Sequence, residues 1–199
     1  MNENVNIKYI FILIVAILLT YLSVYFTMNY GENVQQSIPT DYTLPDIGHY
    51  LLPDFSKYEK TVDIFPVVAI LSLIYLDKFK HANQFIYILA IILILRSISV
   101  SLTILPCSNK NAYEVQNNSK IPYLNGGCHD KMFSGHTAIL ILCTIFILYH
   151  KLVPQKYFSI VIIFTIIGIL AIIATRSHYT VDVFIAIIIT FLTFHYYYF

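Results

Sequence analysis

The chain has 199 residues, a formal net charge of +1, 58% hydrophobic residues and 12% charged residues, and its mean hydropathy is +0.71. Because an average soluble domain carries about 25% charged residues, this composition excludes an ordinary soluble protein and indicates an integral membrane protein. A net charge so near zero also lacks the basic surface that binding to nucleic acid requires, so we expect no nucleic-acid partner.

Six apolar runs are predicted to be membrane spans, since the hydrocarbon core of a bilayer is about 30 Å thick. In chain order they cover residues 9–28, 62–76, 85–105, 137–153, 157–175 and 183–199. The first run is longer than the apolar region of a secretory signal and no small-x-small cleavage site follows it, so we predict a retained helix. The fold class is therefore all-α: a polytopic six-transmembrane helix bundle, forming a single domain over residues 1–199.

The second, fourth and sixth spans are short, and each has an ionisable residue at or near its N-terminal end: Asp63, His136 and Asp182. In a six-span chain these three ends lie on the same side of the membrane. The connections on the other side hold Lys78, Lys80, Lys151 and Lys156. Because short lysine-rich loops stay in the cytoplasm, we expect the histidine side to face the lumen or the exterior, in the Golgi, the endoplasmic reticulum or the plasma membrane.

Two of the three cysteines flank the long loop between the third and fourth spans. Oxidation is permitted on the predicted lumenal side, so a Cys107–Cys128 disulfide would fasten the loop that leads to His136; two free thiols are the alternative. Cys143 lies within a span and is expected to be a small buried apolar residue. The cysteines lack the paired C-x2-C spacing of zinc sites, so we predict no metal.

The first polar cluster opens the fourth span and reads Cys128-His129-Asp130-Lys131-Met132-Phe133-Ser134-Gly135-His136-Thr137. Ser134 is a suitable N-cap, and Gly135 leaves backbone amides open to an approaching anion. A helix N-terminus is a ready phosphate site. Taken alone, His136 is explained by an interfacial cap. Ionisable residues near the membrane interior are nevertheless costly, and they indicate a functional site.

The second polar cluster, His178-Tyr179-Thr180-Val181-Asp182-Val183, opens the sixth span. Residues four apart share one face of a helix, so Asp182 is placed to hold one ring nitrogen of His178 protonated and leave the other free to attack. His136 would then protonate the leaving alkoxide and later deprotonate the incoming hydroxyl. An isolated Asp at this position would serve only the helix dipole. Together, the two clusters predict phosphotransfer chemistry on a lipid.

These residues resemble the sphingomyelin synthase branch of the type 2 phosphatidic acid phosphatase superfamily. That branch carries the patterns Cys-Gly-Asp-x-x-x-Ser-Gly-His-Thr and His-Tyr-Thr-x-Asp-Val, which stand here at residues 128–137 and 178–183. Leu44-Pro45-Asp46 is similar to an element that follows the first span of the family, and residues 96–107 are similar to its third-helix block. The resemblance runs from Leu44 to the C-terminus.

The resemblance implies that His178 is the nucleophile that forms a phosphohistidine, Asp182 its partner, and His136 the acid and base. The implied reaction moves phosphocholine or phosphoethanolamine from a glycerophospholipid donor to a ceramide acceptor and releases diacylglycerol, without a metal or another cofactor. The matched blocks also supply predicted phosphate- and substrate-binding residues, namely Asp130, Ser134, Gly135 and Tyr179.

The chain departs from the family pattern at two positions of the first cluster, where His129 replaces a glycine and Lys131 adds a basic group. We expect both to be loop residues without a catalytic role. For Lys131 the alternative is that its side chain contacts a phosphate of the substrate. Arg96 lies well inside the third span, where a guanidinium is costly, so it is expected to bind phosphate or a buried structural carboxylate. Arg176 is a second candidate for binding phosphate. The alternative is that its side chain only lies at the membrane interface and has no role in binding.

Other functions remain open at this stage. A hydrolase of the same superfamily would use water as acceptor, acting as a lipid phosphate phosphatase or like a phospholipase C. Inositol-phosphorylceramide synthesis and diacylglycerol cholinephosphotransfer use the same chemistry, because composition does not choose the headgroup or the acceptor. A non-catalytic scaffold is disfavoured by the intact His136, His178 and Asp182. The expected partners are the phospholipid donor, the ceramide acceptor and the bilayer. The sequence is also compatible with a homo-oligomer.

Overall fold

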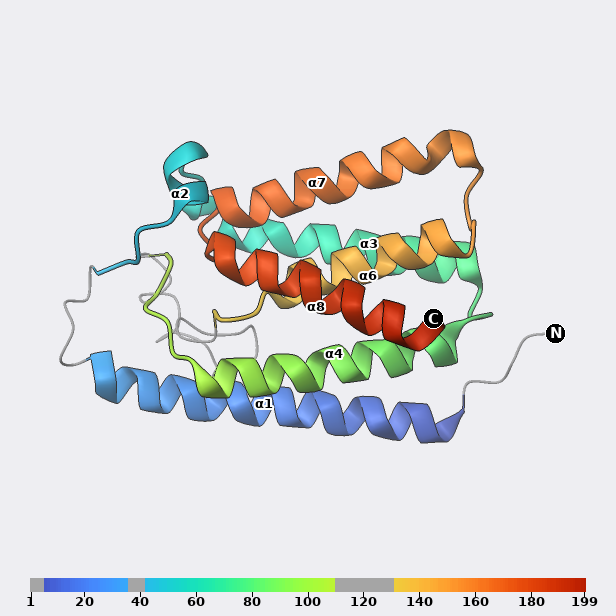
Figure 1. Cartoon of the computed structure of the whole chain (residues 1–199). Helices are drawn as coiled ribbons and strands as arrows, with labels where there is room; N and C mark the ends of the chain where they lie inside the picture. The colour runs from blue at the N-terminus through green and yellow to red at the C-terminus, as the bar shows by residue number, and fades with distance from the viewer. Residues whose placement is uncertain (1–5, 36–41, 110–130) are drawn as a thin grey trace.

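The computed structural model describes residues 6–35, 42–109 and 131–199, and every element among them is helical. In chain order the elements are α1 (Ile7–Gln35), α2 (Ile47–Leu51), the 3-10 helix η1 (Ser56–Asp63), α3 (Ile64–Asp77), α4 (Ala82–Leu102), α6 (Gly135–Tyr149), the 3-10 helix η2 (Gln155–Tyr157), α7 (Phe158–Ala174) and α8 (Thr180–Tyr198). Figure 1 shows the long helices running beside one another as a bundle. The predicted all-α class is confirmed.

Within the described part of the chain, four helical segments are long and apolar enough to cross a membrane: Ile7–Thr27, Ala82–Leu102, Gln155–Ala174 and Thr180–Tyr198. The helices α3 and α6 have 14 and 15 residues, which corresponds to roughly 22 Å at a rise of about 1.5 Å per residue and is less than a hydrocarbon core of about 30 Å. The count of six crossings therefore stays a prediction. The expectation of a short sixth span was wrong, because α8 begins at Thr180 and has 19 residues.

Helix α6 is the central element of the bundle. It contacts α3, α4, α7 and α8, and its buried side chains include Leu140, Leu142, Cys143 and Phe146. Cys143 is a free, fully buried cysteine, as the sequence predicted. Helices α1 and α4 lie side by side along most of their length (Figure 1), and the hydroxyl oxygens of Thr20 and Ser97 are 3.0 Å apart between them.

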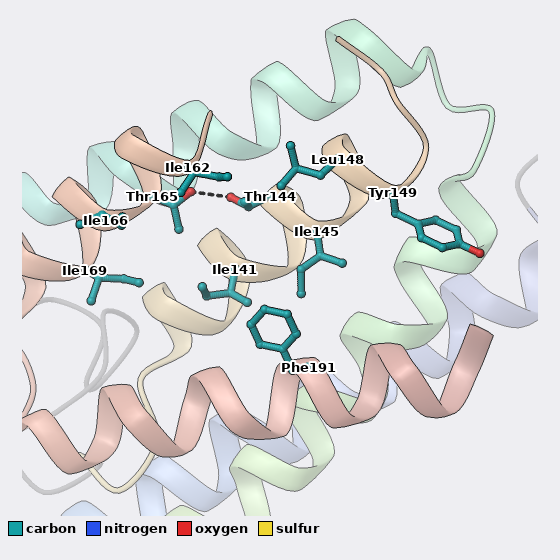
Figure 2. A pocket seen from close by; sticks show the side chains of 10 residues that line it. All are labelled: Ile141, Thr144, Ile145, Leu148, Tyr149, Ile162, Thr165, Ile166, Ile169 and Phe191. Carbon is teal, nitrogen blue, oxygen red and sulfur yellow. Dashed lines mark hydrogen bonds between the residues drawn. The ribbon is translucent and has the colours of Figure 1, made fainter. Parts of the chain in front are cut away.

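A groove of about 570 Å³ lies on α6 between α7 and α8. In Figure 1 these two helices diverge from the linker that joins them. Figure 2 shows isoleucines of α6 and α7 facing Phe191 of α8 across this groove. The hydroxyl groups of Thr144 and Thr165 form a hydrogen bond of 2.6 Å that ties α6 to α7. Such interhelical hydrogen bonds stabilise helix packing in a membrane.

One end of the bundle gathers the starts of α3, α6 and α8, together with α2 (Figure 1). The turns at the opposite end carry Lys78 and Lys151, each with a left-handed backbone (φ 50° and 51°). The common placement of the three helix starts agrees with the prediction that Asp63, His136 and Asp182 lie on one side. These starts hold the polar side chains described next.

Candidate active site

His178 lies in the short linker between α7 and α8 and is 5% exposed. Its Nδ1 atom is 3.3 Å from the Lys131 carbonyl oxygen and 3.6 Å from Oδ2 of Asp182. With a proton on Nδ1, the ring donates to this carbonyl and faces the carboxylate, so the lone pair of Nε2 remains available. A ring held in one tautomer by its second nitrogen is the arrangement expected of a nucleophilic or basic histidine.

The pKa of His178 is lowered well below its ordinary value, chiefly because the ring is buried, and further by the nearby positive charges of Lys131, His136 and Arg96. Desolvation disfavours the charged imidazolium. His178 is therefore neutral at neutral pH, which is the state that a nitrogen nucleophile needs.

Asp182 lies in the first turn of α8 and is fully buried. Its Oδ2 atom accepts a hydrogen bond of 3.0 Å from the backbone N–H of Tyr179, which fixes the carboxylate toward His178. The structure thus brings together the two residues paired from the sequence. The expected reason was wrong, because His178 precedes α8 and does not share a helical face with Asp182. Tyr179 has an extended backbone and is the N-cap of α8, so it joins His178 directly to the turn of helix that carries Asp182.

His136 is the second residue of α6, and its Nε2 atom is 2.7 Å from Oδ1 of Asp63. Asp63 is the last residue of η1 and was not assigned to the site from the sequence, although its place at the start of a short apolar run was the available signal. The side chains of His136 and Asp63 are 33% and 62% exposed. This pair is thus more accessible than the buried pair of His178 and Asp182.

The rings of His136 and His178 lie close together, with centroids 6.3 Å apart and planes inclined at 60°. At this separation both rings can contact one bound phosphoryl group. Each ring has its own carboxylate, one exposed and one buried. Two imidazoles in different environments thus lie at one position, which is the arrangement that a nucleophile and a separate acid and base would need.

The start of α6 is built as predicted around an N-cap serine. The side chain of Ser134 accepts a hydrogen bond of 3.2 Å from the backbone N–H of Thr137, and its own N–H donates to the Asp182 carbonyl at 3.4 Å. A Cβ atom at Gly135 would lie 3.4 Å from Nε of Arg96. The glycine therefore allows a close approach of the guanidinium to the helix N-terminus.

Arg96 projects from α4 toward this end and is 9% exposed. Its positive charge is one of the causes that lower the pKa of His178. Its closeness to Gly135 joins a cation to the amides of a helix N-terminus, and both features favour anions. The sequence identified Arg96 and Gly135 separately but did not indicate that they meet.

Lys131 is a loop residue, as expected from the sequence. Its side chain is 8% exposed and its Nζ atom is 3.8 Å from Oε1 of Glu59, while its carbonyl oxygen is 3.3 Å from Nδ1 of His178. Lys131 therefore helps to form the wall of the site. Its contact with phosphate stays a prediction. The predicted residues Cys128, His129 and Asp130 lie outside the described residues.

Tyr179 and Arg176, predicted to contact substrate, are engaged by the protein backbone. The Tyr179 hydroxyl donates to the Pro106 carbonyl at 3.1 Å. Nη2 of Arg176 donates to the carbonyls of His49 and Leu52 at 2.7 and 3.1 Å. These contacts give both side chains a structural role beside the linker, and their predicted contact with substrate stays a prediction.

Cys107 is buried and disulfide-bonded. Its predicted partner Cys128 is outside the described residues, so the Cys107–Cys128 pairing stays a prediction. Among residues 6–35, 42–109 and 131–199, no group of three or more His, Cys, Asp and Glu side chains has the arrangement of a metal site.

Comparison with known proteins gives matches over the part of the chain that carries this site. The family described as "PAP2 superfamily C-terminal" matches residues 127–199, which include His136, His178 and Asp182. A phosphatidylethanolamine:ceramide ethanolaminephosphotransferase of Trypanosoma brucei brucei is 36% identical over 123 residues, covering 56% of this chain and 38% of the relative. A protein of the same description from strain 927/4 GUTat10.1 is 34% identical, with the same coverage. The chain thus spans under two fifths of the length of these relatives.

Proposed function

We propose that this protein is a lipid headgroup phosphotransferase that moves a phosphoethanolamine or phosphocholine group from a glycerophospholipid to ceramide through a phosphohistidine. The observation that carries the proposal is the pair of histidines with centroids 6.3 Å apart. The buried ring has Nδ1 against a carbonyl and a carboxylate. The more exposed ring is hydrogen-bonded to a second carboxylate.

In the first half-reaction, Nε2 of His178 attacks the phosphorus of the donor lipid. The bond between phosphorus and the diacylglycerol oxygen breaks, and protonated His136 gives its proton to that oxygen. Diacylglycerol leaves, and the headgroup phosphate stays on His178. Asp182 and the Lys131 carbonyl hold the Nδ1 proton and stabilise the positive charge that grows on the ring, as in other activated nucleophiles.

In the second half-reaction, a hydroxyl of ceramide attacks the same phosphorus. Neutral His136 takes the hydroxyl proton, the bond between phosphorus and Nε2 breaks, and His178 returns to its neutral form. One residue thus serves as acid and then as base. Asp63 stabilises the protonated form of His136, which is needed at the start of the first half-reaction and is restored by the second. Arg96 and the backbone amides at the start of α6 face the phosphate charge.

The names of the relatives favour phosphoethanolamine as the transferred group. We also propose that the site faces the lumen or the exterior, because Lys78, Lys80, Lys151 and Lys156 lie in the turns at the opposite end of the bundle and lysine-rich turns stay in the cytoplasm. Ceramide in the same leaflet then has direct access as acceptor.

The test uses the full chain in vesicles that contain phosphatidylethanolamine, with and without ceramide. We expect ceramide phosphoethanolamine and diacylglycerol in equal amounts, and little diacylglycerol when ceramide is left out. His178→Ala should abolish both products. His195 is an exposed histidine at the far end of α8, so His195→Ala should retain activity. Release of free phosphoethanolamine at an undiminished rate without ceramide would assign the site to a hydrolase.

A further inference from the structure

Residues 44–54, here called the α2 segment, lie against the linker that carries His178. We propose that His49 and Asp46 of this segment are positioning residues, which hold the backbone of His178 so that its ring meets Asp182 and the phosphorus. The inference rests on the proposed function. It extends that function to side chains that lie 129 to 132 positions before His178 in the chain.

Asp46 joins the N-termini of two helices. Its Oδ2 atom accepts from the backbone N–H of Thr180 at 2.8 Å, and its Oδ1 atom accepts from the Thr180 hydroxyl at 2.7 Å. Oδ1 also accepts from the backbone N–H of His49 at 2.9 Å, which caps α2. A single carboxylate therefore fixes α2 to the first residue of α8, two positions after His178.

Burial alone would raise the pKa of Asp46, but hydrogen bonds from Thr180 and His49 hold it below its usual value. The carboxylate is thus ionised at neutral pH, and a negative charge at a helix N-terminus is favourable. This gives the contact between α2 and α8 an electrostatic as well as a geometric basis.

His49 holds the linker itself. Its Nε2 atom is 3.0 Å from the His178 carbonyl oxygen, and its ring stacks on Tyr179 with centroids 5.4 Å apart and an angle of 28°. Burial lowers the pKa of His49, so the ring is neutral and donates from Nε2 to this carbonyl. The printed sequence gives this histidine no obvious partner, because the contact depends on the fold.

The linker needs such support because its backbone is unusual. Arg176 has φ 59°, a left-handed conformation that residues other than glycine rarely adopt and that surrounding structure must maintain. The Arg176 side chain donates to the His49 and Leu52 carbonyls, and its own carbonyl accepts from the Ser108 hydroxyl at 2.7 Å. The α2 segment therefore contacts both sides of the turn that sends the His178 ring inward.

Packing at Gly48 shows how closely the segment is seated. Its N–H donates to the Thr180 hydroxyl at 3.2 Å, and a Cβ atom at this position would clash with that hydroxyl and with Ile173. The contacts between the segment and His178 run through the His178 backbone. Loss of His49 should consequently shift the nucleophile while leaving its chemistry and the substrate contacts intact.

The decisive variants are His49→Ala, His49→Gln and Tyr50→Ala in the full chain, assayed in vesicles of phosphatidylethanolamine and ceramide. A displacement of about 1 Å costs on the order of 100-fold in rate, so His49→Ala should lower kcat roughly 10- to 100-fold, with KM and the melting temperature nearly unchanged. The glutamine amide can donate to the same carbonyl, so His49→Gln should recover most of the rate. Tyr50 is 88% exposed, and its alanine variant should behave as wild type.

The inference is overturned if His49→Ala keeps at least half of the wild-type kcat. It is equally overturned if both His49 variants lose the same activity together with melting temperature, because the role is then structural. The proposed function fails by a different result, namely no ceramide product from wild type or undiminished product from His178→Ala. If the wild type is active, His178→Ala is inactive and His49→Ala has the wild-type rate, only the positioning role of His49 is excluded and the proposed function stands.

Discussion

Replacing Asp63 by asparagine tests the acid and base half of the mechanism. The substitution keeps the shape of the side chain and removes the charge that lies 2.7 Å from Nε2 of His136. A hydrogen bond to a charged group contributes about 1.5–3 kcal/mol when it is shielded, whereas an exposed ion pair contributes about 0–1 kcal/mol. Asp63 and His136 are 62% and 33% exposed. The loss should therefore lie near the upper limit for exposed pairs, about 1 kcal/mol, or roughly fivefold in kcat.

The buried carboxylate should behave differently. Asp182 is fully buried, and in the proposed reaction it faces the positive charge that grows on the His178 ring; removing one partner of a buried charged pair costs about 3–5 kcal/mol. Asp182→Asn should therefore lower kcat by more than about 100-fold, while the asparagine oxygen can still accept the Tyr179 N–H that Asp182 accepts at 3.0 Å. The quantity to measure is the ratio of the loss of kcat in Asp182→Asn to the loss in Asp63→Asn. The two substitutions are chemically the same, so this ratio reports the difference in burial between the two carboxylates.

The assay is the initial rate of ceramide phosphoethanolamine formation, measured at equal amounts of folded protein. Asp77→Asn is the matched control, since Asp77 forms a similar pair with His81, 2.6 Å between Oδ1 and Nδ1, in the turn between α3 and α4 at the other end of the bundle. It should leave kcat unchanged. A wild-type rate for Asp63→Asn, or a loss as large as that of Asp182→Asn, would refute the assignment of His136 and Asp63 as the accessible acid and base.

Two further results are expected. His136→Ala should abolish both release of diacylglycerol and formation of the ceramide product, because the same ring acts in both half-reactions; retention of the first alone would contradict this. Mass spectrometry of unreduced protein should find Cys107 joined to Cys128, and two alkylatable thiols would exclude the bridge.

The sequence predicted the helices well because hydrophobic runs report directly on burial and on contact with lipid. Its errors concern the ends of helices. The sixth span was expected from residue 183, but α8 begins at Thr180, since the Asp46 carboxylate accepts hydrogen bonds from Thr180 and caps the helix earlier. That cap comes from a residue 134 positions away, and periodicity carries no information about such a partner.

In the candidate site, too, local features could be predicted from the sequence and contacts between distant segments could not. His178 and Asp182 were paired because they are four residues apart, and Ser134 was identified as an N-cap from its local context. The contacts of His136 with Asp63, of Gly135 with Arg96 and of His178 with the Lys131 carbonyl join segments that are far apart in the chain. Chemistry within one turn of chain can be inferred from spacing, whereas contacts between helices need the packing of the bundle.

The contrast between the two histidines also accounts for how the proposed reaction could use two lipids at one site. A nucleophile that must be neutral and fixed is best buried, and His178 is held by the linker, by Asp182 and by the α2 segment. An acid and base must give a proton to one lipid and take a proton from another, and the more exposed His136 meets that need. If the two environments were exchanged, the nucleophile would lose its fixed tautomer and the acid would lose access to the second substrate. Burial of one ring and exposure of the other therefore follow from the chemistry that the site is proposed to perform.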